Sequence, residues 1–267
     1  MARVYAAEHA ILRKRVAIKT LLPQVGRCAA ARELLMREAR IAAEINHPNV
    51  VDVYDFAIDD AGPYYVMELA TGHTLADRLQ QGPLSLPQCL DICIRLADAV
   101  AAIHAAGYIH RDIKSENVVL TTIGRRLEPK LIDFGIAKAL DPNPNTNQLE
   151  GMIGTPQTMA PEQISQDTID ERTDVWALGV LFYEMLTGHL PFPTGCTTRD
   201  DLIAIVTEPP LPLPLGLQSQ VHEIIDACLS KDPEERLPSA AALVDRLRAA
   251  RRRNLASRRA IERIVGY

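Results

Sequence analysis

One short stretch, His110 to Asn117, constrains this chain more than any other part of it. It reads His-Arg-Asp-Ile-Lys-Ser-Glu-Asn, and the triplet Asp133-Phe134-Gly135 begins sixteen residues after its end. The two motifs supply a carboxylate at 112, an ammonium at 114, a carboxamide at 117 and a second carboxylate at 133. Phosphoryl transfer requires such groups: one to orient the attacking hydroxyl, one to stabilise the migrating phosphoryl group, and hard oxygen ligands for magnesium.

The first motif is specific enough to suggest a family. Its five fixed positions, H-R-D-x-K-x-x-N, match by chance about once in a few million windows. D-F-G alone is a weak signal, which its position downstream of the first motif strengthens. Together the motifs resemble the catalytic loop and metal-binding turn of the bacterial eukaryotic-like (Hanks-type) Ser/Thr protein kinases. The resemblance implies an α+β, bilobal protein-kinase-like fold: a small, mainly β N-lobe at residues 1–70, a larger, mainly helical C-lobe at 71–250 and a basic tail at 251–267.

Two charged residues of the N-lobe gain a role from the resemblance. The segment Val16-Ala17-Ile18-Lys19 matches the V-A-I-K strand, so Lys19 resembles the lysine that holds the α- and β-phosphates of ATP. Residues 29–46 have the apolar stripe and the charge of an amphipathic helix. Within that helix Glu38 resembles the glutamate that pairs with the lysine. Without the resemblance, each would be an ordinary surface charge.

The linker between the lobes carries the expected adenine contacts. Met67 resembles the residue behind the adenine, and the backbone of Glu68 and Ala70 resembles the groups that hydrogen-bond its edge. A buried methionine is equally explained as core. Gly72 follows as a break between the lobes.

The glycine-rich loop departs from the family pattern. G-x-G-x-x-G-x-V would end at Val4, which puts Ala2 on the third glycine and the first two before residue 1. Glycines matter there because backbone amides must approach phosphates closely. We therefore expect a truncated N-lobe that lacks the first strand and half of the phosphate lid, or a true start further upstream.

Residues 133–162 resemble an activation segment that ends in Gly-Thr-Pro-Gln-Thr-Met-Ala-Pro-Glu, with Thr158 where the family often has tyrosine. Arg111, beside the catalytic aspartate, suggests control by a phosphate docked from this segment. Thr146 and Thr155 are the predicted autophosphorylation sites.

The roles that the resemblance implies fall into four groups. The catalytic residues are Asp112 and Lys114; the ATP contacts are Val4, Ala17, Lys19, Glu38, Met67, Glu68, Ala70, Asn117 and Asp133; the metal ligands are Asn117 and Asp133; the structural residues are Arg111, Glu162, Asp174 and Arg236. Asp174 is expected to brace the catalytic loop, and Arg236 to pair with Glu162. The implied cofactors are ATP and Mg²⁺, with Mn²⁺ as an alternative metal.

Bulk properties narrow the partners. The formal net charge is −5, so no global basic field attracts nucleic acid, and we expect no nucleic-acid partner. Five scattered cysteines lack the paired spacing of a zinc site and suggest reduced thiols.

No signal-like segment and no transmembrane-length apolar run is present, so we expect a cytoplasmic protein. The tail from 251 is rich in arginine, which suits a solvated helix end, an acidic partner or an anionic membrane surface.

Three functions remain open at this point. The first is a Ser/Thr protein kinase that acts on protein hydroxyls, with a regulatory partner or a homodimer as its means of control. The second is a pseudokinase scaffold, favoured by the incomplete lid and disfavoured by the full set of catalytic residue types. The third is a small-molecule phosphotransferase, against which the segment ending at Glu162 argues.

Pattern reading also predicts the main elements. We expect strands at 1–9, 16–19, 50–56 and 64–69, and a helix at 91–106 closed by Gly107. A hairpin of 118–120 and 130–132 should surround a surface turn at 121–129. Further helices are expected at 173–186, capped by Thr173 or Asp174, and at 218–230 and 238–250.

Overall fold

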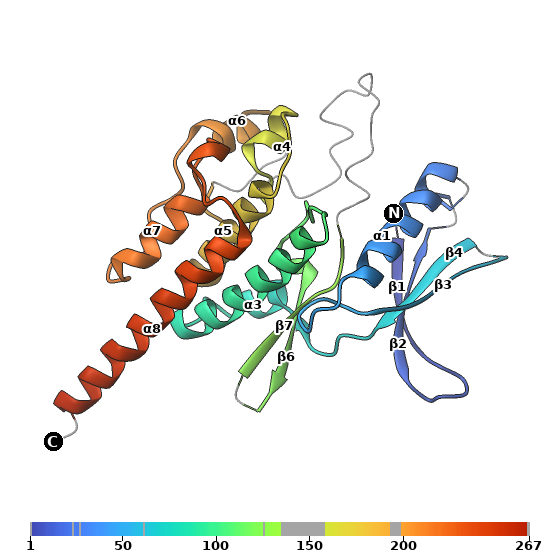
Figure 1. Cartoon of the computed structure of the whole chain (residues 1–267), viewed down its shortest axis with the longest axis horizontal. Coiled ribbons are helices and arrows are strands. Elements are labelled where there is room, and N and C mark those ends of the chain that lie inside the picture. The colour runs from blue at the N-terminus through green and yellow to red at the C-terminus, as the bar shows by residue number, and fades with distance from the viewer. Residues whose placement is uncertain are drawn as a thin grey trace.

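The N-terminal part of the chain is built on an antiparallel sheet that one helix covers (Figure 1). The computed structural model describes residues 2–265 except 23, 27, 61, 125, 135–157 and 193–198. The sheet has the order β1-β2-β4-β3 and consists of β1 (Ala2–Glu8), β2 (Arg15–Leu21), β3 (Val53–Asp59) and β4 (Gly62–Glu68). Helix α1 (Ala29–Glu44) follows β2. The predicted β-rich N-lobe is confirmed.

Alternating side chains of this sheet meet one face of α1. In β4 every second residue is buried, which is the pattern of a strand with one face against a core. Tyr65 and Met67 come from this strand, and Leu35 and Ala39 from α1. The resulting small core is also where the functional strand β2 is anchored, because Ala17 belongs to it.

A second, three-stranded sheet links the N-terminal part to the helices. It has the order β5-β6-β7 and consists of β5 (His73–Thr74), β6 (Val118–Ile123) and β7 (Arg126–Leu131). Gly72 has φ +148°, and a Cβ there would lie 2.1 Å from the carbonyl oxygen of Leu120. A glycine is therefore required where the linker crosses β6.

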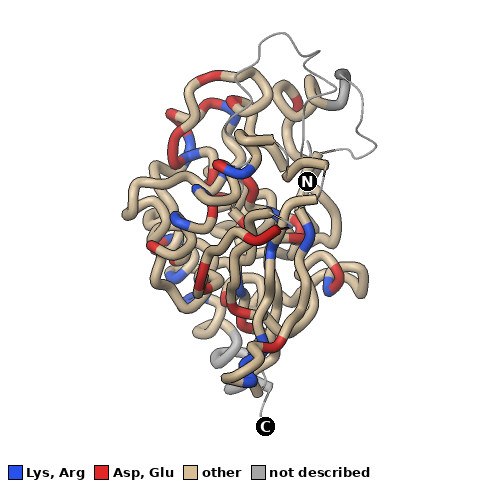
Figure 2. The backbone as a smooth tube through the Cα atoms, turned by 90° about the vertical axis from the view of Figure 1, so that its right-hand side faces the viewer, with Lys and Arg blue, Asp and Glu red and all other residues tan. Residues whose placement is uncertain are grey.

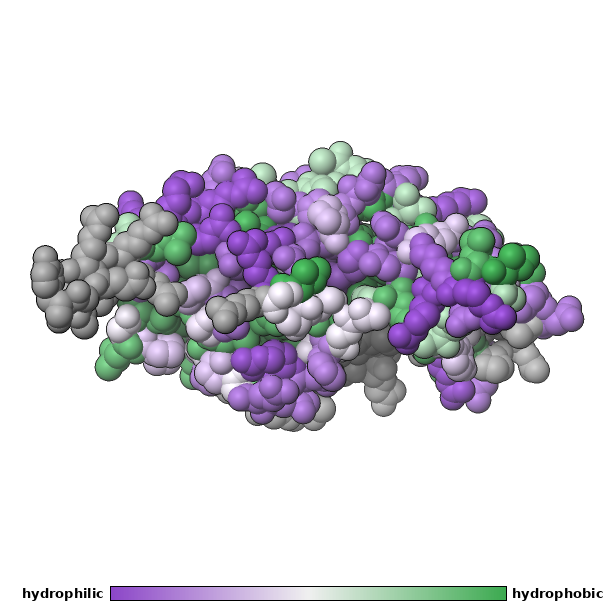
Figure 3. Space-filling view, turned by 90° about the horizontal axis from the view of Figure 1, so that it is seen from below, coloured by the Kyte–Doolittle hydropathy of each residue, from purple (hydrophilic) through white to green (hydrophobic). Residues whose placement is uncertain are grey.

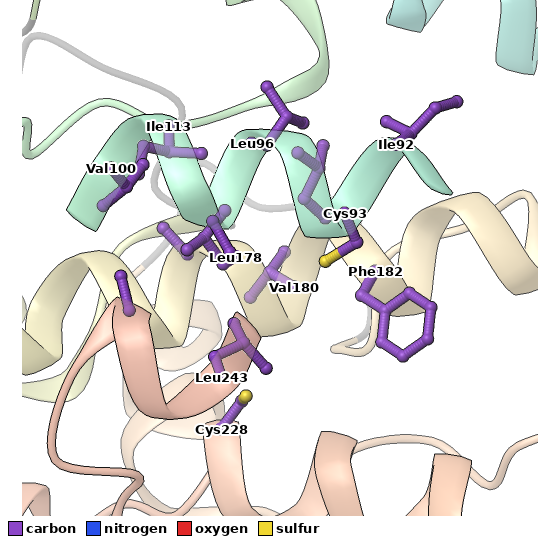
Figure 4. Packing of buried hydrophobic residues seen from close by; sticks show 14 of the residues in the cluster. Ile92, Cys93, Leu96, Val100, Ile113, Leu178, Val180, Phe182, Cys228 and Leu243 are labelled. Atoms are coloured by element: carbon purple, nitrogen blue, oxygen red, sulfur yellow. The ribbon is translucent and has the colours of Figure 1, made fainter. Parts of the chain in front are cut away.

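The rest of the chain is helical and packs around one large core. Its helices are α2 (Leu75–Leu79), α3 (Leu86–Ala105), α4 (Pro161–Ser165), α5 (Arg172–Thr187), α6 (Arg199–Thr207), α7 (Ser219–Cys228) and α8 (Ala240–Val265), with 3₁₀ turns at Ser115–Asn117 and Pro233–Glu235. Figure 4 shows side chains of α3, α5, α7 and α8 meeting, among them Cys93, Leu178, Cys228 and Leu243. These helices form the predicted helical C-lobe.

Close packing fixes how α5 meets α7. A Cβ at Gly179 would lie 2.4 Å from the Cβ of Cys228, so α5 approaches α7 at a position where no side chain fits. Burial also raises the pKa of the Cys93 and Cys228 thiols well above the ordinary value. These thiols therefore act as small apolar side chains of the core.

Several predicted boundaries were wrong for identifiable reasons. Helix α3 begins at Leu86 rather than 91, because Ser85 and Gln88 form a capping box. The segment 121–129 is mostly strand, since β6 and β7 continue to a tight turn at Gly124, where φ is +62°. Neither Thr173 nor Asp174 caps α5, which begins at Arg172. Helix α6 was not predicted.

Helix α8 is far longer than the predicted 238–250. It continues to Val265 because no glycine or proline interrupts the alanine- and arginine-rich sequence from 240 to 265. It lies along α3, where Arg251 pairs with Asp91 at 3.0 Å. Most of the basic tail is thus a continuation of this helix (Figure 1). In the described part of the chain, no helix is long and apolar enough to span a bilayer.

Candidate active site

Three distant segments bring their charges together at Lys19. Its ammonium lies 2.6 Å from Oε1 of Glu38 on α1 and also contacts Oδ1 of Asp133, which follows β7. Lys19 and Glu38 are only 6% and 4% exposed. The three predicted residues are therefore brought together as the resemblance implied, with the lysine between two carboxylates.

Electrostatics holds the lysine of this cluster in its charged form. Burial opposes the ammonium, but the carboxylates of Glu38 and Asp133 outweigh it and raise the pKa of Lys19. Burial raises the pKa of Glu38 to about 8, against the lowering effect of Lys19. For Asp133, Lys19 outweighs burial and lowers the pKa. Asp133 is thus the carboxylate of the pair that stays ionised most readily.

A buried tyrosine supports the cluster from β4. The hydroxyl of Tyr65 donates a 2.8 Å hydrogen bond to Oε1 of Glu38. Tyr65 stands opposite Lys19 in the register of β2 and β4. Burial and the neighbouring Glu38 raise the pKa of this hydroxyl, so it remains a donor.

The strands also place the other expected nucleotide contacts of the N-lobe. Val4 stands opposite Lys19 in the β1–β2 register and is 56% exposed on the outer strand. Ala17 stands opposite Met67, and both are buried in the small core. The structure thus sets Ala17 and Met67 side by side beneath the sheet, while Val4 faces solvent.

The linker leaves a defined set of backbone groups for a ligand. The N–H of Glu68 donates to the carbonyl of Asp52 at 2.8 Å, so of this residue only the carbonyl is available. The Glu68 side chain pairs with Lys130 on β7. Ala70 makes no backbone hydrogen bond to another described residue. These groups fit a planar ligand that donates to Glu68 and pairs with Ala70.

The catalytic loop forms a second polar cluster. Asn117 donates through Nδ2 to the backbone oxygen of Asp112 at 2.8 Å and to its Oδ2 at 3.0 Å. The ammonium of Lys114 lies 3.6 Å from Oδ1 of Asp112. The loop thus brings an ammonium and a carboxamide together at the carboxylate of Asp112.

The residues at 117 and 133 fit a magnesium ion by the chemistry of their donors. Because the nitrogen of Asn117 is committed to Asp112, its amide oxygen is the end left for a cation. Asp133 adds an ionised carboxylate whose Oδ2 is not the atom bound by Lys19. Carboxylate and amide oxygens are the hard ligands that Mg²⁺ prefers.

A fully buried carboxylate braces the backbone of the catalytic loop. Asp174 accepts the N–H of His110 through Oδ2 and the N–H of Arg111 through Oδ1, each at 2.8 Å. Its Oδ2 also lies 2.8 Å from Nε2 of His104 on α3. Arg111 has φ +66°, an unfavourable left-handed conformation that these bonds stabilise.

The ring of His110 connects the loop to the segment that carries Asp133. It stacks on Phe134 with ring centroids 5.1 Å apart, and its Nδ1 accepts the N–H of Asp112 at 3.3 Å. Burial lowers the pKa of His110 and favours the neutral ring that such acceptance requires.

A buried ion pair fixes the end of the expected activation segment. Arg236 binds both carboxylate oxygens of Glu162, at 2.7 and 2.8 Å, and Thr173 donates to Oε1 at 2.7 Å. Burial opposes ionisation of Glu162, but the bonds from Arg236 and Thr173 lower its pKa. The structure therefore places the predicted partners in contact.

Prediction and structure cannot be matched at two predicted residues and at two supporting residues that were not predicted. Thr146 and Thr155 lie outside the described residues. Tyr65 and His104 were missed as supports, although a histidine on the apolar face of a helix was a usable signal for a buried partner. Tyr65 gave no signal, because its alternation in β4 is that of any core tyrosine.

Comparison with known proteins agrees with this geometry. The protein kinase domain family matches residues 1–246. The chain is 36% identical over 261 residues to the serine/threonine-protein kinase pkn2 of Myxococcus xanthus, covering 94% of this chain and 31% of that protein. It is 36% identical over 257 residues to the serine/threonine-protein kinase PknA of Mycobacterium tuberculosis, covering 94% of this chain and 58% of that protein.

The match covers only part of the length of each relative. The serine/threonine-protein kinase PknB of Mycobacterium leprae is 35% identical over 251 residues, and the match covers 40% of its length. The chain thus spans between about a third and somewhat more than half of these curated relatives. From the matched family and from the two polar clusters, we conclude that the chain belongs to the protein kinase domain family.

Proposed function

We propose that the chain transfers the γ-phosphoryl group of ATP to serine and threonine hydroxyls of proteins. The observation that carries this proposal is the position of Lys19 between Glu38 and Asp133, since three segments far apart in sequence supply it. The names of the bacterial relatives support a protein Ser/Thr acceptor. The pattern of Lys114 two residues after Asp112 agrees with that acceptor class.

Each side chain has one task in this proposal. Lys19, oriented by Glu38, binds the α- and β-phosphates, while the linker at Glu68 and Ala70 pairs with the adenine edge. Asp112 orients the acceptor hydroxyl and takes its proton, and Lys114 stabilises charge on the transferred group. Asn117 and Asp133 would hold Mg²⁺, with Mn²⁺ as an alternative. A bound divalent ion supplies positive charge that offsets repulsion between phosphate oxygens.

The residues that hold the catalytic loop and the expected activation segment also have a role in the proposal. Asp174 holds the backbone of the loop that carries Asp112, and Glu162 with Arg236 fixes the segment that contacts protein substrates. Arg111 is proposed to dock a phosphate added at Thr146 or Thr155, so that autophosphorylation or a regulatory partner controls activity. Free cysteines among the described residues support a cytoplasmic location.

The test is transfer of labelled phosphate from MgATP to the purified chain and to a generic basic protein. Asp112→Asn, which keeps the shape of the side chain, should abolish incorporation, whereas the native chain labels both proteins. An upstream-extended chain is assayed in parallel, because only the end of the G-x-G-x-x-G-x-V pattern, up to Val4, falls within residues 1–267. If neither the chain of residues 1–267 nor the upstream-extended chain transfers phosphate, while ATP binding is retained, the proposal is contradicted and a pseudokinase scaffold is favoured.

A further inference from the structure

Two turns on one side of the molecule hold aliphatic side chains out in solvent. Ile11 and Leu12, in the turn between β1 and β2, are 85% and 71% exposed. Ile123, at the turn between β6 and β7, is 63% exposed. Figure 1 places both turns on the lower side of the molecule, toward which the C-terminal end of α8 also runs. Exposed apolar side chains that gather on one face mark a contact surface.

Hydrogen bonds fix the shape of the first turn, which carries two of the aliphatic residues. Nδ1 of His9 accepts the N–H groups of Ile11 and Leu12, at 3.3 and 3.2 Å. The N–H of His9 donates to Lys14 O at 2.8 Å, and Arg13 has φ +55°. Because these bonds satisfy the backbone within the turn, both aliphatic side chains point away from the sheet with no core to enter.

Basic residues surround these aliphatic tips. Arg13, Lys14 and Arg15 follow Leu12 directly and are exposed; Arg13 pairs with Glu8 at 2.9 Å, and the ammonium of Lys14 lies 3.8 Å from the centre of the Tyr54 ring. Arg126 is exposed at the second turn. Arg252 and Arg253 on α8 are exposed as well. Figure 2 shows blue Lys and Arg segments at the lower end of the molecule, with red Asp and Glu segments beside them. Figure 3, which looks at this lower side, shows green hydrophobic patches set among purple hydrophilic ones.

We propose that the lower side of the molecule, along which the β1–β2 turn, the β6–β7 turn and the C-terminal half of α8 lie apart from one another, docks on an anionic lipid surface (Figure 1). The aliphatic tips enter the headgroup region, and the arginine and lysine side chains bind lipid phosphates. A lipid surface suits separate protruding tips, since it deforms around each of them. A protein partner would instead require a continuous patch or a groove, and a nucleic acid would not use aliphatic side chains.

The chain offers a matched control for the aliphatic tips. Ile58 is 71% exposed, the same as Leu12, but it precedes Asp59 and Asp60 in the β3–β4 turn. That turn lies to the right in Figure 1, away from the lower side. Ile58→Ser therefore removes an equally exposed isoleucine from an acidic turn outside the proposed face.

The experiment is vesicle flotation of the full chain with neutral phosphatidylcholine vesicles and with vesicles containing phosphatidylglycerol. We expect binding to the anionic vesicles alone, weakened by added salt. Ile11→Ser with Leu12→Ser should reduce binding on the order of tenfold, as should Arg13→Gln with Lys14→Gln through the charge. Ile58→Ser and Asp112→Asn should bind like the native chain, so the result is independent of phosphoryl transfer.

Other outcomes overturn the proposal. Absence of binding to anionic vesicles would do so, as would an equal loss in Ile58→Ser. Gel filtration and thermal melts of each variant accompany the flotation. If the native chain were a dimer that Ile11→Ser with Leu12→Ser dissociates, the tips would join two copies, and the lipid assignment would be wrong.

Discussion

Tyr65 donates a 2.8 Å hydrogen bond to Oε1 of Glu38, the same oxygen that lies 2.6 Å from the ammonium of Lys19. Tyr65→Phe removes this donor with little change in packed volume, so Glu38 loses one of the groups that orient it. We expect kcat/KM for MgATP-dependent transfer to fall about three- to tenfold, in line with one neutral hydrogen bond. Steady-state phosphate transfer at varied ATP concentration measures this change.

The same strand provides the comparison for that exchange. Tyr64 is the neighbouring residue of β4, and its side chain lies on the opposite face of the sheet. Tyr64→Phe should leave kcat/KM unchanged. Equal kinetics for Tyr65→Phe and the native chain would show that Lys19 alone is enough to position Glu38.

Replacing Asp174 should damage the catalytic loop without touching the reacting groups. Asp174→Asn places an amide against two N–H donors, so at least one of the 2.8 Å bonds to His110 and Arg111 is lost. We expect kcat to fall about 10- to 100-fold, since misplacement of a catalytic group is costly. The KM for ATP should change little. Asp167→Asn, an exposed exchange in the loop before α5, should behave as the native chain.

The ion pair of Glu162 and Arg236 should dominate the response of the C-lobe to denaturant. Arg236→Met leaves Glu162 buried without its cation and should lower the free energy of unfolding by about 3–5 kcal/mol. The exposed pair of Arg13 and Glu8 is the reference, and Arg13→Ala should cost below about 1 kcal/mol. Urea unfolding measures both. Similar costs for the two variants would contradict the assigned strength of the buried pair.

The partly buried carboxyl of Glu184 predicts a pH dependence of stability. Burial raises its pKa to about 7, although the Ser115 hydroxyl donates to it at 3.1 Å. The folded state then binds more protons than the unfolded state between about pH 4.5 and 7, so this group's contribution to stability falls as pH rises through that window.

A neutral isostere tests that assignment. Glu184→Gln should raise the free energy of unfolding at pH 8 by about 1–3 kcal/mol and change it little at pH 5. Thermal melts from pH 5 to 8 measure the difference. Glu223→Gln, an exposed exchange on α7, is the control. A gain of equal size at pH 5 and pH 8 would mean that Glu184 is ionised throughout.

Autophosphorylation is predicted at Thr146 or Thr155. After incubation with MgATP, phosphopeptide mapping should find label in the peptide that spans one of them, and Asp112→Asn should carry none. Arg111→Lys keeps the charge but loses the bidentate geometry, so it should weaken activation by that label. Label only elsewhere in the chain would exclude this mode of control.

The sequence was most informative where chemistry restricts residue type. Asp112 and Asp133 were identified before the fold because their two motifs combine groups that phosphoryl transfer requires, whereas Lys19 gained its role from the family resemblance. The pairing of Glu162 with Arg236, across 74 residues of sequence, came from the family resemblance rather than from any local pattern. Local patterns also gave the N-lobe strands, among which burial alternates at every residue in β4.

Local patterns failed where contacts distant in sequence decide. The hairpin of β6 and β7 is longer than predicted because residues between 121 and 129 pair with one another across the two strands. The local pattern offered Asp174 as a cap of α5, whereas its brace to the backbone of a loop more than sixty residues earlier was expected only from the family resemblance. Tyr65 could not be distinguished from a core residue, since its partner Glu38 comes from another element.

The contact between Gly72 and Leu120 determines where the two lobes can pivot. Thr121 donates to the carbonyl of Thr71, and His73 pairs with Leu120, so the chain from 71 to 74 moves with β6 as one body. Rotation of the N-terminal sheet against β6 therefore bends the linker between Glu68 and Ala70, and also the segment before β3, where Val51 donates to the carbonyl of Leu131 on β7. Glu68 and Ala70, which are proposed to pair with the adenine edge, are thus also the two ends of this pivot, and a ligand bound there would stiffen the joint between the lobes.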